Sequence, residues 1–359
     1  MRTKPARYAH RIQFAVKTIL LPVIICLAAR REAWKLMNNE KLIDKSHVVV
    51  HAENLKKHYP TKGGKILKAL DGVSFDIYEG EILGVVGESG CGKSTLGRSV
   101  LRLFPVTEGK LEFEGHDITN LSKRQLKNYR RDMQMIFQNP YSSFHPKQKI
   151  GSALREVGKV YKMSDEEINQ KIKELLEYIR LPEDMLLRSP GELSGGQLQR
   201  LAIARALILK PSFIVADEPV SALDVSVQAQ ILNLIVDLRK EMKMTMMFIS
   251  HEMSVVEHIC DRVAVMYLGQ IVEMAPTKEL FDNISHPYTK ALMSAIPIAD
   301  PEEKKQRIIL EGDIPNAIDL PEGCSFASRC QFCTEKCKKE KPQLRCLGND
   351  HYVACHNMM

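Results

Sequence analysis

The chain has 359 residues, enough for one large domain or two to three smaller ones, and its 44% hydrophobic and 26% charged residues are typical of a soluble globular protein. Its net charge of +7 is carried by residues 1–36, which hold eight Lys or Arg and one acidic residue. The rest of the chain is neutral, unlike a protein held to nucleic acid by charge, so we expect no nucleic-acid partner.

Residues 1–36 form a basic N-terminal segment around a short apolar stretch. That stretch, residues 18–29, has twelve residues and contains Pro22, whereas a helix that spans a bilayer needs about 20. A secretory signal is disfavoured because residues 27–29 make a poor cleavage site. Two interpretations stay open: an amphipathic segment that rests on an anionic membrane, or an extension absent from the native protein, which would then start at Met37. We favour the second.

Three short runs predict a set of antiparallel strands in the first part of the chain. They cover residues 47–55, residues 69–78 and the strand that ends at Val86, with glycines between them. Tyr59 follows the first run. An aromatic residue there can stack on adenine, although tyrosine more often packs against other side chains. Residues 111–115 continue the strand pattern.

A glycine-rich loop lies between a buried strand and a predicted helix. Glycines let the backbone N–H groups of such a loop turn toward a phosphate, and the helix start adds the positive end of its dipole. Lys93 can reach the β- and γ-phosphates, and the Ser94 hydroxyl can bind Mg²⁺. This context predicts a P-loop that binds a nucleoside triphosphate. Its residues are Gly87, Glu88, Ser89, Gly90, Cys91, Gly92, Lys93, Ser94 and Thr95.

A helical insert is predicted over about residues 139–200, because residues 151–188 combine helical spacing with dense charge. Gln138 stands just before this insert, at the end of a strand. The insert closes on a polar, glycine-containing helix start, which can act as a second anion-binding cap. This start is formed by Ser194, Gly195, Gly196 and Gln197.

Acidic residues follow the next buried strand. Asp217 is suited to hold Mg²⁺ through water, and Glu218 to orient an attacking water. The sequence Ser-Ala-Leu-Asp, which ends at Asp224, precedes a helix predicted to run to about residue 241. His251 follows a further buried strand, at the edge where α/β sheets bind ligands.

In order and type, these motifs resemble those of the ATP-binding subunit of ABC transporters over about residues 47–290. The P-loop, glutamine loop, Leu-Ser-Gly-Gly-Gln signature, acidic strand end, Ser-Ala-Leu-Asp loop and switch histidine all match. The resemblance implies an α/β fold, a P-loop NTPase of the ABC type with an antiparallel β-subdomain. We expect this domain over residues 47–275, with a helical subdomain at about 139–200 and a small Cys-rich extension over residues 276–359.

The resemblance also implies roles for individual residues and the use of ATP and Mg²⁺. Glu218 is expected to be the catalytic base, His251 to hold the γ-phosphate, and Tyr59 to stack on adenine. Gln138 is expected to sense both Mg²⁺ and the permease. The expected Mg²⁺ ligands are Ser94, Gln138 and Asp217.

Members of this family pair head to tail, so Ser194, Gly195 and Gly196 are expected to grip a γ-phosphate bound by the partner chain, with Gln197 and Asp224 also at the nucleotide. The chain has one P-loop, one signature and no stretch of 18 apolar residues. We therefore expect a second ABC ATPase, either a copy or a paralogue, with the paralogue favoured. Two transmembrane permease subunits and, indirectly, an extracytoplasmic solute-binding protein complete the expected assembly. This implies a peripheral location on the cytoplasmic face of the cell membrane.

The C-terminal extension narrows the family. Residues 283–292, 321–330 and 353–356 resemble parts of oligopeptide and dipeptide importers, and residues 67–74 and the P-loop look most like their "F" partner subunit. The resemblance implies an ATP-hydrolysing subunit that energises peptide import through a separate permease. The alternatives are an importer of nickel or another small solute, and a soluble ABC ATPase that remodels nucleic acid or ribosomes.

Six of the nine cysteines lie in the last 36 residues. Family members use such a pattern for a [4Fe–4S] cluster, four thiolates also suit zinc, and a set of unligated thiols is the third option. Cys333 could replace a neighbour as a ligand. In the P-loop, Cys91 is expected to be a small filler, with a redox-active thiol of lowered pKa as the alternative. The four expected ligands are Cys324, Cys330, Cys337 and Cys355.

Overall fold

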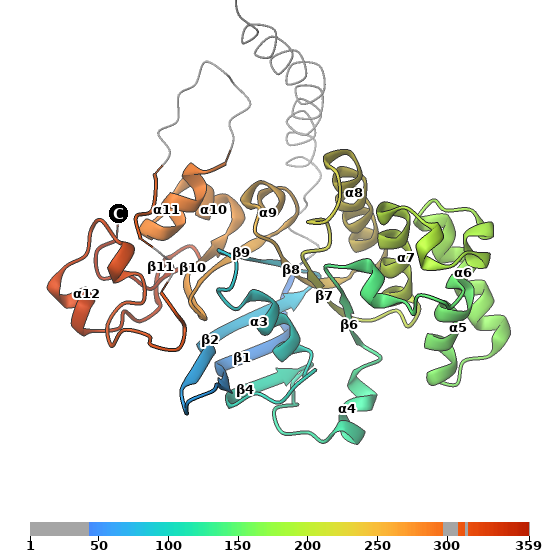
Figure 1. The fold of residues 1–359 in the computed structure, drawn as a ribbon, viewed down its shortest axis with the longest axis horizontal. Helices are drawn as coiled ribbons and strands as arrows, with labels where there is room; N and C mark the ends of the chain where they lie inside the picture. The colour runs from blue at the N-terminus through green and yellow to red at the C-terminus, as the bar shows by residue number, and fades with distance from the viewer. Residues whose placement is uncertain (1–42, 297–307, 313–314, 359) are drawn as a thin grey trace, which may run out of the picture.

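The computed structural model describes residues 43–296, 308–312 and 315–358, so the expectation for residues 1–36 lies outside the described residues. Two sheets and the helices around them make up the described chain (Figure 1). The strands are β1 (Asp44–Pro60), β2 (Ile66–Glu79), β3 (Ile82–Val86), β4 (Glu108–Phe113), β5 (His116–Asp117), β6 (Met133–Ile136), β7 (Phe213–Asp217), β8 (Thr245–Ile249), β9 (Arg262–Tyr267), β10 (Gln270–Pro276), β11 (Arg345–Gly348) and β12 (His351–Val353). The α-helices are α3 (Lys93–Val100), α4 (Lys123–Tyr129), α5 (Ile150–Val160), α6 (Asp165–Tyr178), α7 (Gly195–Leu207), α8 (Val225–Met242), α9 (Met253–Ile259), α10 (Thr277–Asp282), α11 (Pro287–Ser294) and α12 (Glu335–Lys339). Short 3₁₀ helices cover Pro140–Ser143, Glu183–Leu187, Pro190–Glu192 and Ala327–Arg329.

The larger sheet has eight strands in the order β11-β12-β10-β9-β3-β8-β7-β6. β3 pairs in parallel with β8 and β9, and β7 pairs in parallel with β6 and β8. Every residue of β3, β7 and β8 is buried, as is typical of parallel strands, which are continuous apolar runs because both faces are covered. The loops that follow β3, β6, β7 and β8 therefore meet at one edge of the sheet, which is where open α/β sheets bind ligands.

The smaller sheet is antiparallel, with the order β2-β1-β4-β5. The expectation that the strand ending at Val86 belongs to this set is wrong, because β3 lies in the larger sheet. Its apolar run lacks the alternation that gives a strand a solvent-facing side. β1 also continues to Pro60, beyond the expected end at residue 55. Tyr59 therefore lies within a strand, opposite Leu67 of β2.

Helices α5, α6 and α7 carry the helical spacing predicted for residues 151–188 and the helix start that follows it. α6 begins after Ser164, whose hydroxyl accepts a hydrogen bond from the N–H of Glu167 at 3.1 Å. The first turn of α6 is acidic, and negative charge there stabilises the helix by interacting with the positive end of its dipole. Apolar side chains of all three helices share one buried cluster with β3, β7 and β8. The insert is therefore packed onto the main core (Figure 1).

The C-terminal segment, the described part of residues 276–358, is attached to the sheet that carries the P-loop. β12 pairs antiparallel with β10, and β11 pairs with β12. Tyr288 of α11 and Phe326 are buried in the main hydrophobic core. In the part of the chain that the structure describes, no helix is both long and apolar enough to cross a bilayer.

Candidate functional site

The P-loop joins β3 to α3, and its shape depends on two glycines. Gly87 has a φ of 152° and Gly92 a φ of 104°, a backbone region that residues with side chains rarely adopt. A Cβ atom on Gly87 would collide with the carbonyl oxygen of Met266, and one on Gly92 with that of Ala69. Only glycine fits at these two points, where the loop lies against neighbouring backbone.

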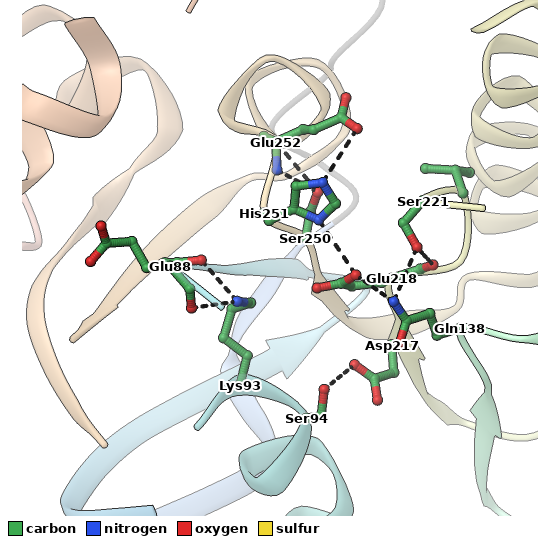
Figure 2. Close-up of polar contacts among 12 residues, drawn as sticks. Glu88, Lys93, Ser94, Gln138, Asp217, Glu218, Ser221, Ser250, His251 and Glu252 are labelled. Carbon is green, nitrogen blue, oxygen red and sulfur yellow. Dashed lines mark hydrogen bonds and ion pairs between the residues drawn. The ribbon is translucent and has the colours of Figure 1, made fainter. Parts of the chain in front are cut away.

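Lys93 begins α3 and points back into the loop (Figure 2). Its Nζ donates hydrogen bonds to the carbonyl oxygens of Gly87, at 2.8 Å, and Glu88, at 3.0 Å, and the residue is only 5% exposed. The ammonium charge is therefore fixed at the start of a helix, where the positive end of the dipole and a cation together attract phosphate. This arrangement is suited to the β- and γ-phosphates of a nucleotide.

Ser94 and Asp217 offer two oxygen ligands side by side. The Ser94 hydroxyl donates to Oδ1 of Asp217 at 2.8 Å (Figure 2), and Asp217 is buried at the end of β7. Burial raises the pKa of this carboxyl, and Arg98 lies 3.8 Å from its other oxygen. Mg²⁺ prefers one or two protein oxygens with water and substrate phosphates, so the pair fits the ion that accompanies ATP.

Glu218, Gln138 and His251 come together from the ends of three parallel strands (Figure 2). Nε2 of Gln138 donates to Oε2 of Glu218 at 2.8 Å, and Nδ1 of His251 lies 3.4 Å from the same oxygen. The two polar side chains therefore orient the carboxylate from either side. A carboxylate held in this way can take a proton from a water that attacks a neighbouring phosphate.

The backbone at Glu218 is a feature that the sequence pattern does not reveal. Glu218 has a φ of 47°, which is rare outside glycine and is held only where neighbours enforce it. Its N–H donates to the carbonyl oxygen of Ile249 at 3.0 Å, and its carbonyl oxygen accepts from the hydroxyl of Ser221 at 3.1 Å. This turn after β7 fixes the direction in which the Glu218 side chain leaves the strand.

The signature motif forms the start of α7. The Ser194 hydroxyl accepts from the N–H of Gln197 at 3.3 Å, and the side-chain oxygen of Gln197 accepts from the N–H of Ser194 at 3.0 Å, which makes a capping box. Ser194 is exposed, and α7 lies apart from α3 in Figure 1. The chain therefore presents its signature away from its own P-loop.

Tyr59 and Asp224 contact residues other than those of this cluster. The half-buried Tyr59 ring packs edge-on against Phe104, with 6.1 Å between ring centroids, and Nζ of Lys57 lies 4.8 Å from its centroid. Asp224 is exposed and caps α8 by accepting from the N–H of Val227 at 3.0 Å. Their expected roles at the nucleotide stay predictions.

Comparison with known proteins identifies the family. Residues 70–221 match the family described as ABC transporter, and residues 272–337 match the oligopeptide/dipeptide transporter, C-terminal region. The chain is 46% identical over 318 residues to oligopeptide transport ATP-binding protein AppF of Bacillus subtilis, covering 86% of this chain and 97% of AppF. The chain is an ABC ATPase of the peptide-transporter family. Di/tripeptide transport ATP-binding protein DppF of Pseudomonas aeruginosa is likewise 46% identical, over 315 residues, with the same shares covered.

This ABC ATPase is also similar to solved structures. The dimeric structure of the ATP-binding cassette MJ0796, in a post-hydrolysis state with ADP and Pi, is 31% identical with a TM-score of 0.58 and covers 64% of this chain and 98% of its own. The structure of cbiO1 from Clostridium perfringens is 26% identical with a TM-score of 0.59, covering 66% and 91%. The predicted P-loop NTPase fold is thereby confirmed, and an ABC ATPase uses ATP with Mg²⁺.

Cys91 of the ABC ATPase is a packed side chain. It is only 3% exposed, and burial raises the pKa of its thiol. The expected lowering of this pKa is therefore wrong, because loss of water outweighs the nearby charge of Lys93. The expectation of a small filler agrees with this burial.

The C-terminal cysteines lie close enough to influence one another. Burial, and secondarily the neighbouring thiols, raises the pKa of Cys324 to about 11 and also raises the pKa of Cys330 and Cys355. Asn357 donates its backbone N–H to Sγ of Cys355 at 3.3 Å and its side-chain amide to Sγ of Cys337 at 3.5 Å. Within the described ranges, no three His, Cys, Asp or Glu side chains are placed to hold one metal ion. Neither the expected [4Fe–4S] cluster nor zinc therefore gains support from the side-chain placement there.

Proposed function

We propose that this ABC ATPase energises the import of oligopeptides or dipeptides through a separate membrane permease. The match of residues 272–337 to the C-terminal region of oligopeptide/dipeptide transporters carries the proposal. The names of AppF and DppF, which align with 86% of the chain, support it. An importer of nickel or another small solute, or an ATPase that remodels nucleic acid or ribosomes, has no comparable support.

In this function, the P-loop binds the triphosphate, and the neighbouring groups act on its phosphates, on Mg²⁺ or on the attacking water. Lys93 neutralises phosphate charge, while Ser94 and Asp217 offer oxygen ligands to Mg²⁺, which supplies further charge neutralisation when bound. Glu218 accepts a proton from the attacking water, with Gln138 and His251 in contact with its carboxylate. His251 would also hold the γ-phosphate, and Gln138 would bind Mg²⁺.

The second half of each site is proposed to come from another ABC ATPase. The exposed Ser194 cap and the separation of α7 from α3 support a head-to-tail pair in which each signature meets the other chain's P-loop. Two permease subunits would anchor the pair at the cytoplasmic face of the membrane. Closing and opening of the pair would then drive the permease between its states.

The Cys-rich segment is proposed to hold a [4Fe–4S] cluster on Cys324, Cys330, Cys337 and Cys355. Four partly or fully buried thiols, with Asn357 donating toward two of them, suit thiolate ligation of a cluster. Iron and acid-labile sulfide are measured on anaerobically purified protein. About four of each, lost in Cys355→Ser, is the expected result, whereas protein that contains neither iron nor acid-labile sulfide contradicts the proposal.

The test of peptide import uses the complex purified from its native membrane through this chain and placed in vesicles. We expect ATP-dependent uptake of a labelled di- or oligopeptide, lost when the chain carries Glu218→Gln. Labelled nickel serves as the competing cargo. Nickel uptake without peptide uptake, or purification with ribosomal proteins and no permease, would contradict peptide import.

A further inference from the structure

The C-terminal segment holds one residue of the P-loop from outside. The Arg329 guanidinium makes a two-pronged contact with the Glu88 carboxylate, Nη1 to Oε2 at 2.7 Å and Nη2 to Oε1 at 3.0 Å. The backbone N–H of Glu88 donates to the hydroxyl of Tyr288 at 2.9 Å. These partners stand 241 and 200 positions further along the chain, so no local sequence pattern reveals the contact.

Both partners are themselves fixed by packing. Tyr288 is fully buried, and the Arg329 side chain is only 6% exposed. The rings of Tyr267, Tyr288 and Phe326 pack against one another with centroids 4.8 to 5.4 Å apart, and Arg329 lies over the Tyr267 ring. Burial raises the pKa of Tyr288, so its hydroxyl keeps its proton. An Arg–carboxylate contact of this fork geometry is stronger and more directional than a single hydrogen bond.

Glu88 is consequently constrained on three sides. The Tyr288 hydroxyl accepts a hydrogen bond from the Glu88 N–H, and Arg329 donates to the Glu88 carboxylate. Lys93 donates to the Glu88 carbonyl oxygen at 3.0 Å. The peptide planes of a P-loop decide which N–H groups face the phosphates. A residue whose peptide group is fixed in this way therefore presets the loop before nucleotide arrives, which lowers the ordering cost of binding.

We propose that Arg329 and Tyr288 are positioning residues of the ATP site, which act through Glu88 to hold the P-loop in its phosphate-binding shape. The C-terminal segment is thereby a structural part of nucleotide binding. This inference depends on ATP binding and not on the transported cargo, so it stands or falls separately from peptide import.

Equilibrium binding of a fluorescent ATP analogue and steady-state ATP hydrolysis test the inference on the full chain. Tyr288→Phe removes only the hydroxyl that accepts the Glu88 N–H, and Arg329→Ala removes the fork. We expect each variant to raise Kd and KM for ATP about tenfold with kcat changed much less, because the P-loop binds substrate and transition state alike. The double variant Glu88→Ala/Arg329→Ala should lose no more affinity for ATP than Arg329→Ala alone, because both substitutions remove the same contact.

Lys341→Ala is the matched control. Lys341 belongs to the same C-terminal segment and forms an ion pair with Asp71 at 3.1 Å, which lies outside the P-loop. This variant should keep the wild-type Kd. Unchanged Kd and KM in both Tyr288→Phe and folded Arg329→Ala would overturn the inference. An equal loss of affinity for ATP in Lys341→Ala would overturn it as well. Arg329→Lys, which keeps the charge without the fork, should recover part of the affinity.

Discussion

The chain contains two helix starts suited to phosphate, and they are built in opposite ways. At the start of α3, Gly92 precedes the helix with a positive φ and no side-chain cap, and Lys93 and the C-terminal segment hold the loop. At the start of α7, Ser194 and Gln197 satisfy each other in a local capping box, and Ser194 is exposed. The first start depends on distant parts of the chain, whereas the second depends on four consecutive residues.

This difference shows which half of an ATP site the chain completes by itself. At the α3 start, Lys93, the Ser94–Asp217 pair and Glu218 lie within one cluster (Figure 2), and we propose that they bind phosphate, hold Mg²⁺ and accept a proton, respectively. The α7 start is held by its own capping box, and we propose that it completes the site of a partner chain. Substitutions at Glu218 and Gly92 should therefore separate a loss of hydrolysis from a loss of nucleotide binding.

The largest effect is expected at Glu218, the proposed catalytic carboxylate. Glu218→Gln keeps a hydrogen-bonding side chain of the same size but cannot accept a proton. We expect kcat of the transporter complex to fall about a thousandfold, while Kd for ATP stays near the wild-type value. Asp237→Asn, which neutralises an exposed carboxylate on α8, is the control. Unchanged turnover in Glu218→Gln would remove Glu218 from its assigned role.

The two helix starts should respond differently to an added methyl group. In Gly92→Ala, the Cβ meets the carbonyl oxygen of Ala69 at a φ of 104°, so we expect nucleotide affinity to fall by about two orders of magnitude. In Gly195→Ala, the Cβ meets only a Leu223 side-chain atom at 3.4 Å, an ordinary contact. Binding to the chain's own P-loop should then be unchanged. Equal losses in both variants, measured by nucleotide titration, would contradict the contrast.

A third helix start adds a dependence on pH. The Nδ1 atom of His286 accepts the N–H of Tyr288 at 3.0 Å and so caps α11, and burial lowers the pKa of His286 to about 4. Below about pH 6.5, His286 is protonated in the unfolded chain but stays neutral in the folded protein. The free energy of unfolding therefore falls as the pH drops from about 6.5 to 4.

Urea unfolding measures this dependence at pH 7.5 and pH 5. His286→Asn keeps a capping side chain without the titration. Between these two pH values the wild type should lose about 2 kcal/mol more unfolding free energy than the variant. Identical losses in the two proteins would exclude His286 as the source.

The smallest effect is expected at the Ser194 cap. Ser194→Ala leaves the N–H of Gln197 without its acceptor and should lower the unfolding free energy by about 1 kcal/mol. Ser194→Thr retains an acceptor at the same position and should recover most of that loss. Chemical denaturation measures the unfolding free energy of the wild type and both variants. An unchanged value in Ser194→Ala would contradict a stabilising cap and would show that water replaces it.

The local motifs could be predicted from the sequence because each is contiguous. The P-loop, the Ser194 cap and the strand ends before Gln138, Glu218 and His251 follow from runs and spacing alone. The prediction for the strand that ends at Val86 is wrong because this strand pairs with β8 and β9, which lie far along the chain.

The remaining features depend on packing that spacing does not reveal. The left-handed backbone of Glu218 and the hydrogen bonds of Tyr288 and Arg329 to Glu88 depend on contacts between residues far apart in the sequence. Cys91 shows the same point for chemistry, because a thiol at a helix start can have a lowered pKa, and only its burial in the fold shows that the pKa is raised instead.

The head-to-tail arrangement is tested most directly by a photo-crosslinking residue at Gly191, just before the signature. A Cβ there meets nothing within 4 Å, so the substitution leaves the Ser194 cap intact. The complex is purified from its native membrane with Glu218→Gln in this chain and irradiated with Mg²⁺ and ATP. We predict an ATP-dependent adduct to the P-loop region of the other ATPase subunit. An adduct to the chain's own P-loop, or one that forms equally without ATP, would contradict the account.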